Sequence, residues 1–214
     1  MAKENNQGGE GRERTPRNID KHARIISAAL KVFAEKGFYN TRISEIASEA
    51  NVADGTIYLY FKNKDDILIS LFEEELGKII AIMREELGKT DDPVEKLRIF
   101  AKRHLNMILD NRNLAEVIQV ELRQSSKFMR EYVNEPFAEY INLVKGVIGE
   151  GQERNVFRKD VAPGIIKRAF FGALDEMARY WVLSTTRKYK PNDSAKDISE
   201  IFIRGLLVEN SKKE

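Results

Sequence analysis

The segment that decides the fold reads SEIASEANVADGTIYLYF and runs from Ser44 to Phe61. It consists of a short helical stretch, a turn at Asn51 and a second short stretch, in which Ile57 and Phe61 lie four residues apart on one face. Ala47 is small at a position where two helices must cross closely. A helix packed in this way can place its outer face in the major groove of DNA, which is wide enough for one helix. The segment therefore predicts a helix-turn-helix.

The outer face of the second stretch carries groups that suit DNA. Tyr58 and Tyr60 offer hydroxyls, Lys62 and Lys64 offer ammonium groups, and Gly55 permits close approach of the backbone. Tyr58 has a second interpretation, as a half-buried packing residue. These groups predict a surface that contacts mainly phosphate oxygens.

On both sides of this segment, almost the whole chain shows the spacing of apolar residues that is typical of helices. Apolar residues recur at i, i+3 and i+4, and no run alternates strictly with period 2. The expected helices cover residues 19–36, 55–61, 64–87, 93–109, 113–123, 126–151, 162–186 and 195–209, with one more short helix that ends at Asn51. The expected N-caps are Thr41 or Ser44, then Asp54, Asn63, and Asp91 or Asp92, with Pro93 at a first helical position. The prediction is an all-α protein.

Three parts follow from this pattern. Residues 1–17 are polar and rich in Gly, Glu and Arg, which predicts a disordered N-terminal arm. Residues 18–64 form the predicted three-helix DNA-binding domain. Residues 65–214 form a predicted helical domain for ligand binding and dimerisation.

Composition excludes several classes of protein. The 214 residues include no cysteine and two histidines, which excludes disulfide scaffolds and makes a cysteine- or histidine-based metal site untenable. No apolar run is long enough to span a membrane and no secretory signal is present, so a cytoplasmic protein without a membrane partner is expected. The net charge is +2, from 36 basic and 34 acidic residues. Residues 1–64 carry 11 basic and 8 acidic residues, a weak indication of contact with a polyanion.

Residues 28–68 resemble the DNA-binding domain of the TetR family of transcriptional regulators. The matching pieces are AALKVFAEKGF at 28–38, TRISEIA at 41–47, NVADGTIYLYF at 51–61 and KDDIL at 64–68. The resemblance implies a homodimer that binds a palindromic operator in double-stranded DNA. It also implies DNA contacts by Thr41, Arg42, Ser44, Gly55, Thr56, Tyr58, Tyr60 and Lys64. For Arg42, a solvated surface position is the alternative.

The two C-terminal helices carry apolar residues on more than one side, which favours burial on more than one face. Two such helices from each subunit can form a four-helix dimer interface. The candidate interface residues are Ala169, Gly172, Ala173, Tyr180, Phe202, Gly205 and Leu206. The alternative is that both helices belong to the core of a monomer.

The middle of the chain offers apolar side chains for a small hydrophobic effector. Candidates are Leu105, Ile108, Leu109, Val117, Phe170, Leu174, Met177 and Trp181. Residues 121–130 and 170–183 resemble the subgroup of TetR-like repressors that control fatty-acid degradation, which implies long-chain acyl-CoA as effector. Arg123, Lys127 and Arg130 could then bind the CoA phosphates, or could be ordinary surface charges.

Other functions remain as alternatives. A TetR-type regulator of multidrug efflux fits the same apolar interior. An enzyme is disfavoured because no triad or nucleotide-binding glycine loop is present. Asp65-Asp66 and Asp91-Asp92 lie at helix starts, where capping explains them. An all-helical interaction protein would differ in not retaining DNA. No cofactor is expected.

Overall fold

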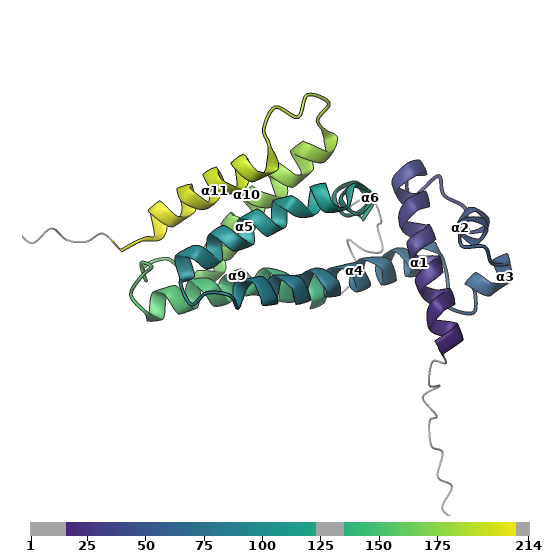
Figure 1. Cartoon of the computed structure of the whole chain (residues 1–214), viewed down its shortest axis with the longest axis horizontal. Coiled ribbons are helices and arrows are strands. Elements are labelled where there is room, and N and C mark those ends of the chain that lie inside the picture. Colours follow the sequence, from purple (N-terminus) through teal and green to yellow (C-terminus); the bar gives the residue numbers. More distant parts are fainter. Residues whose placement is uncertain (1–15, 123–134, 209–214) are drawn as a thin grey trace, which may run out of the picture.

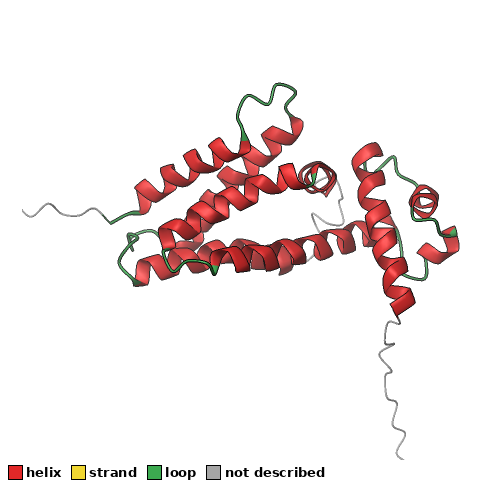
Figure 2. Cartoon of the chain, in the orientation of Figure 1, coloured by secondary structure: helices red, strands yellow, loops and turns green. Residues whose placement is uncertain are grey.

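The computed structural model describes residues 16–122 and 135–208, and every regular element in these ranges is helical (Figure 2). The elements are α1 (Pro16–Lys36), α2 (Ile43–Glu49), α3 (Asp54–Ile57), α4 (Lys64–Leu87), α5 (Pro93–Asp110), α6 (Arg112–Glu116), the π-helix η1 (Val117–Glu121), α9 (Glu135–Glu153), α10 (Pro163–Leu183) and α11 (Pro191–Leu206). The all-α prediction is confirmed over these residues. None of the described helices is long and apolar enough to cross a membrane.

Helices α1 to α3 gather at one end of the molecule, and α4 leads away from them into the larger remainder (Figure 1). Their shared core contains Phe33, Ile46, Ile57 and Phe61, which are almost completely buried. The turn between α2 and α3 passes through Asn51, whose φ of 53° lies in the left-handed region that asparagine tolerates. The predicted helix-turn-helix is therefore formed, with its apolar face inward.

The remaining helices pack around a second part of the same hydrophobic core. Helix α5 packs against α11 and α9, and α10 packs against α9 and α11, while α4 lies along α9 (Figure 1). Phe100 of α5 and Phe170 of α10 are both buried and their ring centroids lie 6.2 Å apart. This arrangement leaves α6 and η1 at the end that faces α1.

Two helix starts follow local sequence signals closely. The Asn63 side chain accepts a hydrogen bond from the backbone N–H of Asp66 at 2.9 Å and caps α4. The Asp92 side chain accepts from Val94 at 2.9 Å, and Pro93 occupies the first turn of α5. These caps satisfy amide groups that have no partner inside the helix.

Other predicted boundaries were wrong. Helix α2 starts after Arg42, so neither Thr41 nor Ser44 is its N-cap, and Ala53 rather than Asp54 precedes α3. Helix α3 covers four residues, because the chain turns from Tyr58 onward. The segment expected as one helix over 113–123 is α6 followed by η1. Helix α11 begins at Pro191 and not at residue 195.

The predicted division between residues 64 and 65 falls at the first residue of α4, which continues without a break to Leu87. One helix therefore belongs to both parts of the chain. Helix α1 begins at Pro16, inside the predicted arm, and residues 1–15 lie outside the described residues. The division into domains stays a prediction.

Candidate functional site

The recognition surface consists of α2, α3 and the turn after α3. Gly55, Lys62, Ser44 and Arg42 are exposed, and Tyr58 is 59% exposed. The packing alternative for Tyr58 therefore does not apply within one chain. The backbone N–H of Arg42 donates to the carboxylate of Glu45 at 2.8 Å, which orders the start of α2 and leaves the guanidinium side chain outside the core.

Two predicted members of this surface are half-buried. Thr56 and Tyr60 lie beside the exposed residues but pack partly against the interior. The Tyr60 ring lies 6.0 Å from the His22 ring of α1, and the His22 Nδ1 lies 3.3 Å from a carboxylate oxygen of Glu74 in α4. Tyr60 thus connects the recognition turn to α1 and α4.

Contrary to the prediction, the side chains of Thr41 and Lys64 do not present free groups to DNA. Thr41 is buried and its hydroxyl donates to the Gly37 carbonyl at 2.8 Å, so the prediction of a phosphate contact is wrong for this side chain. Lys64 Nζ donates to the Thr41 carbonyl at 2.9 Å and to the Tyr39 carbonyl at 3.2 Å, and it lies 4.7 Å from the centre of the Phe38 ring.

Partial burial lowers the pKa of the Lys64 ammonium. The ammonium group has three protons, and two are used by the loop carbonyls. Lys64 therefore fixes the loop before α2 to the start of α4. The same loop exposes Tyr39, a side chain that the pattern of the sequence did not single out.

A small cavity lies in the larger part of the molecule, among residues of α4, α5, α6, η1 and α10. Its volume is about 40 Å³, and it is lined by Ile79, His104, Met107, Ile108, Leu114, Ala115, Ile118, Gln119 and Ala178. On this measure a cavity needs about 10–15 Å³ to hold one water molecule, so this space has room for a small group and not for a long chain. A larger ligand requires the surrounding helices to move.

The predicted ligand residues divide into three groups. Ile108 lines the cavity. Others lie in the core nearby, fully or partly buried, namely Leu105, Val117, Phe170, Leu174, Met177 and Trp181. The prediction for Leu109 was wrong, because its side chain is 50% exposed on the outer face of α5. Arg123, Lys127 and Arg130 lie outside the described residues.

Buried polar groups lie beside the cavity, and the pattern of apolar residues in the sequence did not predict them. His104 Nδ1 lies 2.8 Å from the Tyr140 hydroxyl oxygen, and the Gln119 amide donates to the Asp175 carboxylate at 3.0 Å. Burial lowers the pKa of His104 to about 4, against a smaller opposing effect of Asp175, and burial raises the pKa of Tyr140. A histidine on the apolar face of 93–109 was the one signal available in the sequence.

The π-helix η1 connects this cavity to the recognition domain. Gln119 of η1 lines the cavity, and Glu121, two residues on, accepts a hydrogen bond from the backbone N–H of Phe38 at 2.5 Å. Both α6 and η1 contact α1. Short π-helices are frequent at functional sites, because the wider turn displaces backbone and side chains. A movement of η1 would therefore reach the loop that Lys64 holds.

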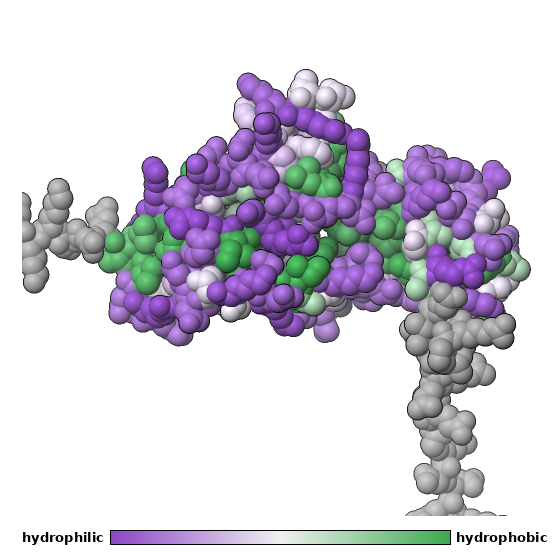
Figure 3. All heavy atoms as spheres, viewed as in Figure 1, coloured by the Kyte–Doolittle hydropathy of each residue, from purple (hydrophilic) through white to green (hydrophobic). Residues whose placement is uncertain are grey.

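Helices α10 and α11 carry apolar residues on an outer surface. Ile165, Leu183 and Ile201 are exposed, as are Ala169, Gly172 and Gly205. A side chain built at either glycine would meet no atom within 4 Å, so the surface is open in a single chain. Apolar atoms also reach the surface where α11 ends (Figure 3).

The other predicted interface residues face the core to differing degrees. Ala173, Tyr180 and Phe202 are half-buried, and the Phe202 ring packs against the Phe170 ring at 5.1 Å between centroids. Leu206 is 6% exposed and belongs to the core of its own chain, so its assignment to an interface was wrong.

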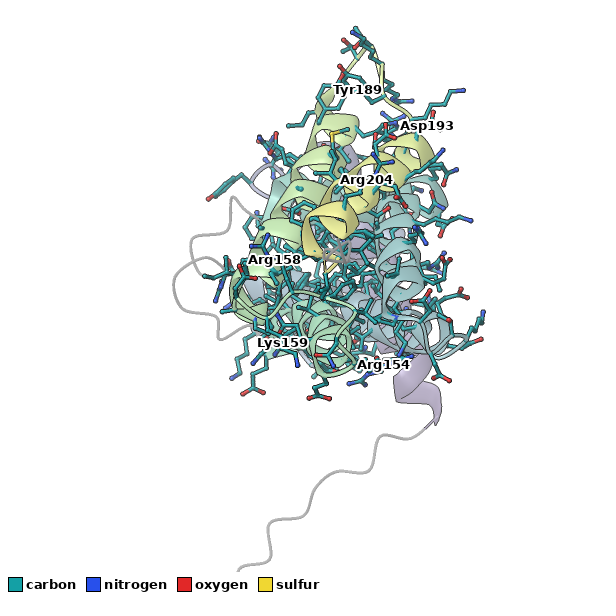
Figure 4. The ribbon with its side chains drawn as sticks, turned by 90° about the vertical axis from the view of Figure 1, so that its left-hand side faces the viewer. Arg154, Arg158, Lys159, Tyr189, Asp193 and Arg204 are labelled. Carbon is teal, nitrogen blue, oxygen red and sulfur yellow. The ribbon has the colours of Figure 1, made fainter. Side chains whose placement is uncertain are left out.

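A basic hollow occupies the end of the molecule remote from α1 to α3 (Figure 4). Arg158 and Lys159, from the turn after α9, and Arg204, from α11, line a space of about 680 Å³. The Arg158 guanidinium is paired with Asp160 at 2.7 Å, and the polar side chains that line the space are exposed. Charged side chains are ordinarily exposed to solvent at a protein surface, so these residues do not indicate a ligand. We therefore assign none to the hollow.

An exposed recognition turn on three helices, joined by one long helix to a helical domain with a small apolar cavity, is the arrangement of a helix-turn-helix regulator. The chain belongs to the TetR family of bacterial regulatory proteins. Residues 25–71 match the model described as "Bacterial regulatory proteins, tetR family", and residues 72–205 match "YsiA-like protein, C-terminal region". The resemblance inferred from residues 28–68 is confirmed.

Similar proteins regulate transcription. The fatty acid metabolism regulator protein of Bacillus subtilis (strain 168) is 38% identical over 87% of this chain and 95% of its own length. The crystal structure of the transcriptional regulator FadR from Bacillus subtilis, in complex with stearoyl-CoA, has a TM-score of 0.80 at 38% identity and covers 86% of this chain and 98% of that one. The fatty acid degradation regulator FadR from Bacillus halodurans has a TM-score of 0.81 at 36% identity, with 91% and 98% covered.

Proposed function

We propose that the protein is a homodimeric repressor of fatty-acid degradation genes, which binds a palindromic operator and is released from it by long-chain acyl-CoA. The observation that carries the proposal is the similarity to fatty acid metabolism regulators along nearly the whole chain. The exposed recognition turn and the apolar cavity supply the two sites that such a repressor needs. The protein acts by binding and carries out no catalysis.

Release of DNA follows from the position of the cavity. A space of about 40 Å³ has no room for an acyl chain, so binding requires α6, η1 and α4 to move apart. Helix α4 runs from the cavity to Lys64, and η1 reaches the loop at Phe38. Both movements change the separation of the two recognition helices in the dimer, which must match successive major grooves about 34 Å apart.

We expect long-chain acyl-CoA to dissociate the protein from its operator, and short-chain acyl-CoA and free CoA to do so poorly. Each buried methylene contributes about 0.8 kcal/mol, so the concentration needed for release should fall as the chain lengthens, until the opened chamber is full. A coupling of about 1–3 kcal/mol between the two sites is typical. The measurement is a titration of butyryl- to stearoyl-CoA against a labelled operator, selected from random-sequence DNA, by fluorescence anisotropy.

A response that does not vary with chain length, or no release at saturating stearoyl-CoA, contradicts the acyl-CoA effector. Release by hydrophobic drugs in its place would instead support a regulator of multidrug efflux.

Dimerisation through α10 and α11 has its own test. Ile201 is 69% exposed in the single chain, so Ile201→Glu leaves the fold intact but places two carboxylates in the proposed interface. We expect dimer affinity to fall at least about tenfold, as measured by sedimentation equilibrium. Leu109→Glu, on α5, makes the same change of charge at an exposed apolar position and should not alter it. An Ile201→Glu dimer of unchanged affinity rejects this interface.

A further inference from the structure

Among the described residues that line the cavity, His104 is the one with a titratable side chain. Its side chain is 6% exposed and is surrounded by aromatic rings, with the Phe100, Tyr140 and Phe171 centroids at 6.1, 5.9 and 5.4 Å. Packing alone does not require a histidine at this position, because an apolar side chain would suit these neighbours better. A histidine at this position is therefore explained by the hydrogen bonds that its ring nitrogen atoms can form.

The hydrogen bond between His104 and Tyr140 allows two positions for the proton of the neutral imidazole ring. If the Tyr140 hydroxyl donates to Nδ1, the neutral ring keeps its proton on Nε2, and one N–H lacks a partner. If Nδ1 donates instead, the Tyr140 hydroxyl proton and the Nε2 lone pair both lack partners. An unsatisfied buried group is destabilising, so the first arrangement, which leaves one such group and not two, is the more stable. In that arrangement Nε2–H is a donor.

Among the described residues, His104 Nε2 has no hydrogen-bond partner. Because Nδ1 points toward Tyr140, the edge of the ring that carries Nε2 points away from α9. His104 lines the cavity and Tyr140 does not, so the imidazole, and not the Tyr140 ring, borders the open space. A second buried atom without a partner in the described part of the chain, Asn106 Oδ1, belongs to a residue that lines a separate, charged hollow between α4 and α5.

An unpartnered N–H beside a small cavity is suited to a ligand that brings an acceptor atom. With a pKa of about 4 the imidazole is neutral at physiological pH, and the nearby Asp175 opposes a second negative charge. A carboxylate would therefore be left without a countercharge, whereas a neutral carbonyl needs one donor and no charge. The cavity, at about 40 Å³, can hold a group of that size.

We propose that His104 Nε2–H binds the carbonyl oxygen of the effector's acyl group, and that Tyr140 positions the imidazole for this contact. The proposal rests on the acyl-CoA effector proposed above and identifies the atom that recognises its thioester. The carbonyl would be fixed beside Gln119 of η1, so the same contact places the acyl group against the element that reaches the recognition domain. The protein would thereby distinguish an acyl compound from a plain alkyl chain of equal length.

The test compares two ligands that differ by one oxygen atom. Palmitoyl-CoA has the thioester carbonyl, and S-hexadecyl-CoA, its alkyl thioether, has a methylene in the same place. We expect the wild-type protein to bind palmitoyl-CoA about 3- to 10-fold more tightly by isothermal titration calorimetry, the value of one neutral hydrogen bond. His104→Leu combined with Tyr140→Phe removes both polar partners, which is nearly neutral for stability. In this double variant the two ligands should bind with affinities within about twofold of each other.

His104→Gln is the conservative variant, because its side-chain amide retains an N–H donor, and it should keep part of the preference. Should the double variant fail to fold by circular dichroism, His104→Met replaces it. Equal wild-type affinities for the two ligands, or a preference that survives in the double variant, overturn the role of His104 and leave the acyl-CoA effector in place. Failure of both ligands to bind the wild-type protein overturns the proposed effector and this inference together.

Discussion

Gly55→Glu is expected to abolish operator binding while the protein remains folded and dimeric. Gly55 is exposed on α3, and a side chain built there meets no atom of the chain within 4 Å. In the complex the same side chain would lie in the major groove, where it would both fill the space reserved for the DNA and bring a carboxylate close to phosphates. We expect operator affinity to fall by more than about 1,000-fold in fluorescence anisotropy at fixed salt, a loss of about 4 kcal/mol.

Gly146→Glu is the matched control for this variant. Gly146 is exposed on α9, and a side chain there also meets no atom within 4 Å, so both variants change the net charge equally. Gly146 belongs to α9, a helix of the larger part of the molecule, whereas α3 lies at the end formed by α1 to α3 (Figure 1). Its variant should bind operator within about twofold of the wild type. Retention of wild-type affinity by Gly55→Glu would show that α3 does not enter the groove.

Features that depend on neighbouring residues could be predicted from the sequence. The Asn63 cap, the Asp92 cap and Pro93 in the first turn of α5 all involve partners within three residues. The recognition segment was predictable for the same reason, because its packing residues and its turn lie within 18 consecutive positions, 44–61. Local chemistry limits such segments to few conformations.

Features that depend on distant residues could not be predicted. Lys64 has the charge of a phosphate ligand, but its partners are carbonyls 23 and 25 residues earlier in the chain. Thr41 has the hydroxyl of a phosphate ligand, but the tertiary fold buries it. For both residues the chemistry of the side chain was interpreted correctly, but its surroundings could not be predicted, because burial depends on how the folded chain packs.

The residues of the ligand site could be predicted from the sequence even less well, because they too depend on distant parts of the chain. Apolar residues form every core, so the sequence could not separate Ile108, which lines the cavity, from Leu105, which does not, or from Leu109, which is exposed. The pairing of His104 with Tyr140 joins residues 36 positions apart, on α5 and α9. Only the folded chain shows that, among the described residues, this pair leaves Nε2 of a cavity-lining imidazole without a hydrogen-bond partner.

The end of the molecule opposite the recognition surface depends on one close contact. Gly151 of α9 is buried against Phe157, and a Cβ atom at Gly151 would lie 2.0 Å from the Phe157 ring. Phe157 forms an antiparallel bridge with Leu207, and Arg158 donates its backbone N–H to the Leu206 carbonyl at 2.7 Å. This contact therefore fixes the end of α11, on which the proposed dimer interface depends.

A double-mutant cycle at Gly151 and Phe157 is expected to be strongly non-additive. Phe157→Ala should destabilise the protein by about 3–5 kcal/mol through the cavity it leaves, and Gly151→Ala by about 1–3 kcal/mol through the clash with the ring. In the double variant the ring is absent, so the Gly151→Ala methyl fills part of the cavity and alanine favours the helix by about 0.5–1 kcal/mol. The double variant should therefore be no less stable than Phe157→Ala alone, in urea unfolding at one protein concentration. If the losses of stability in the two single variants simply add in the double variant, the Phe157 ring is not the reason that residue 151 is glycine. The close contact between α9 and Phe157 must then have another cause.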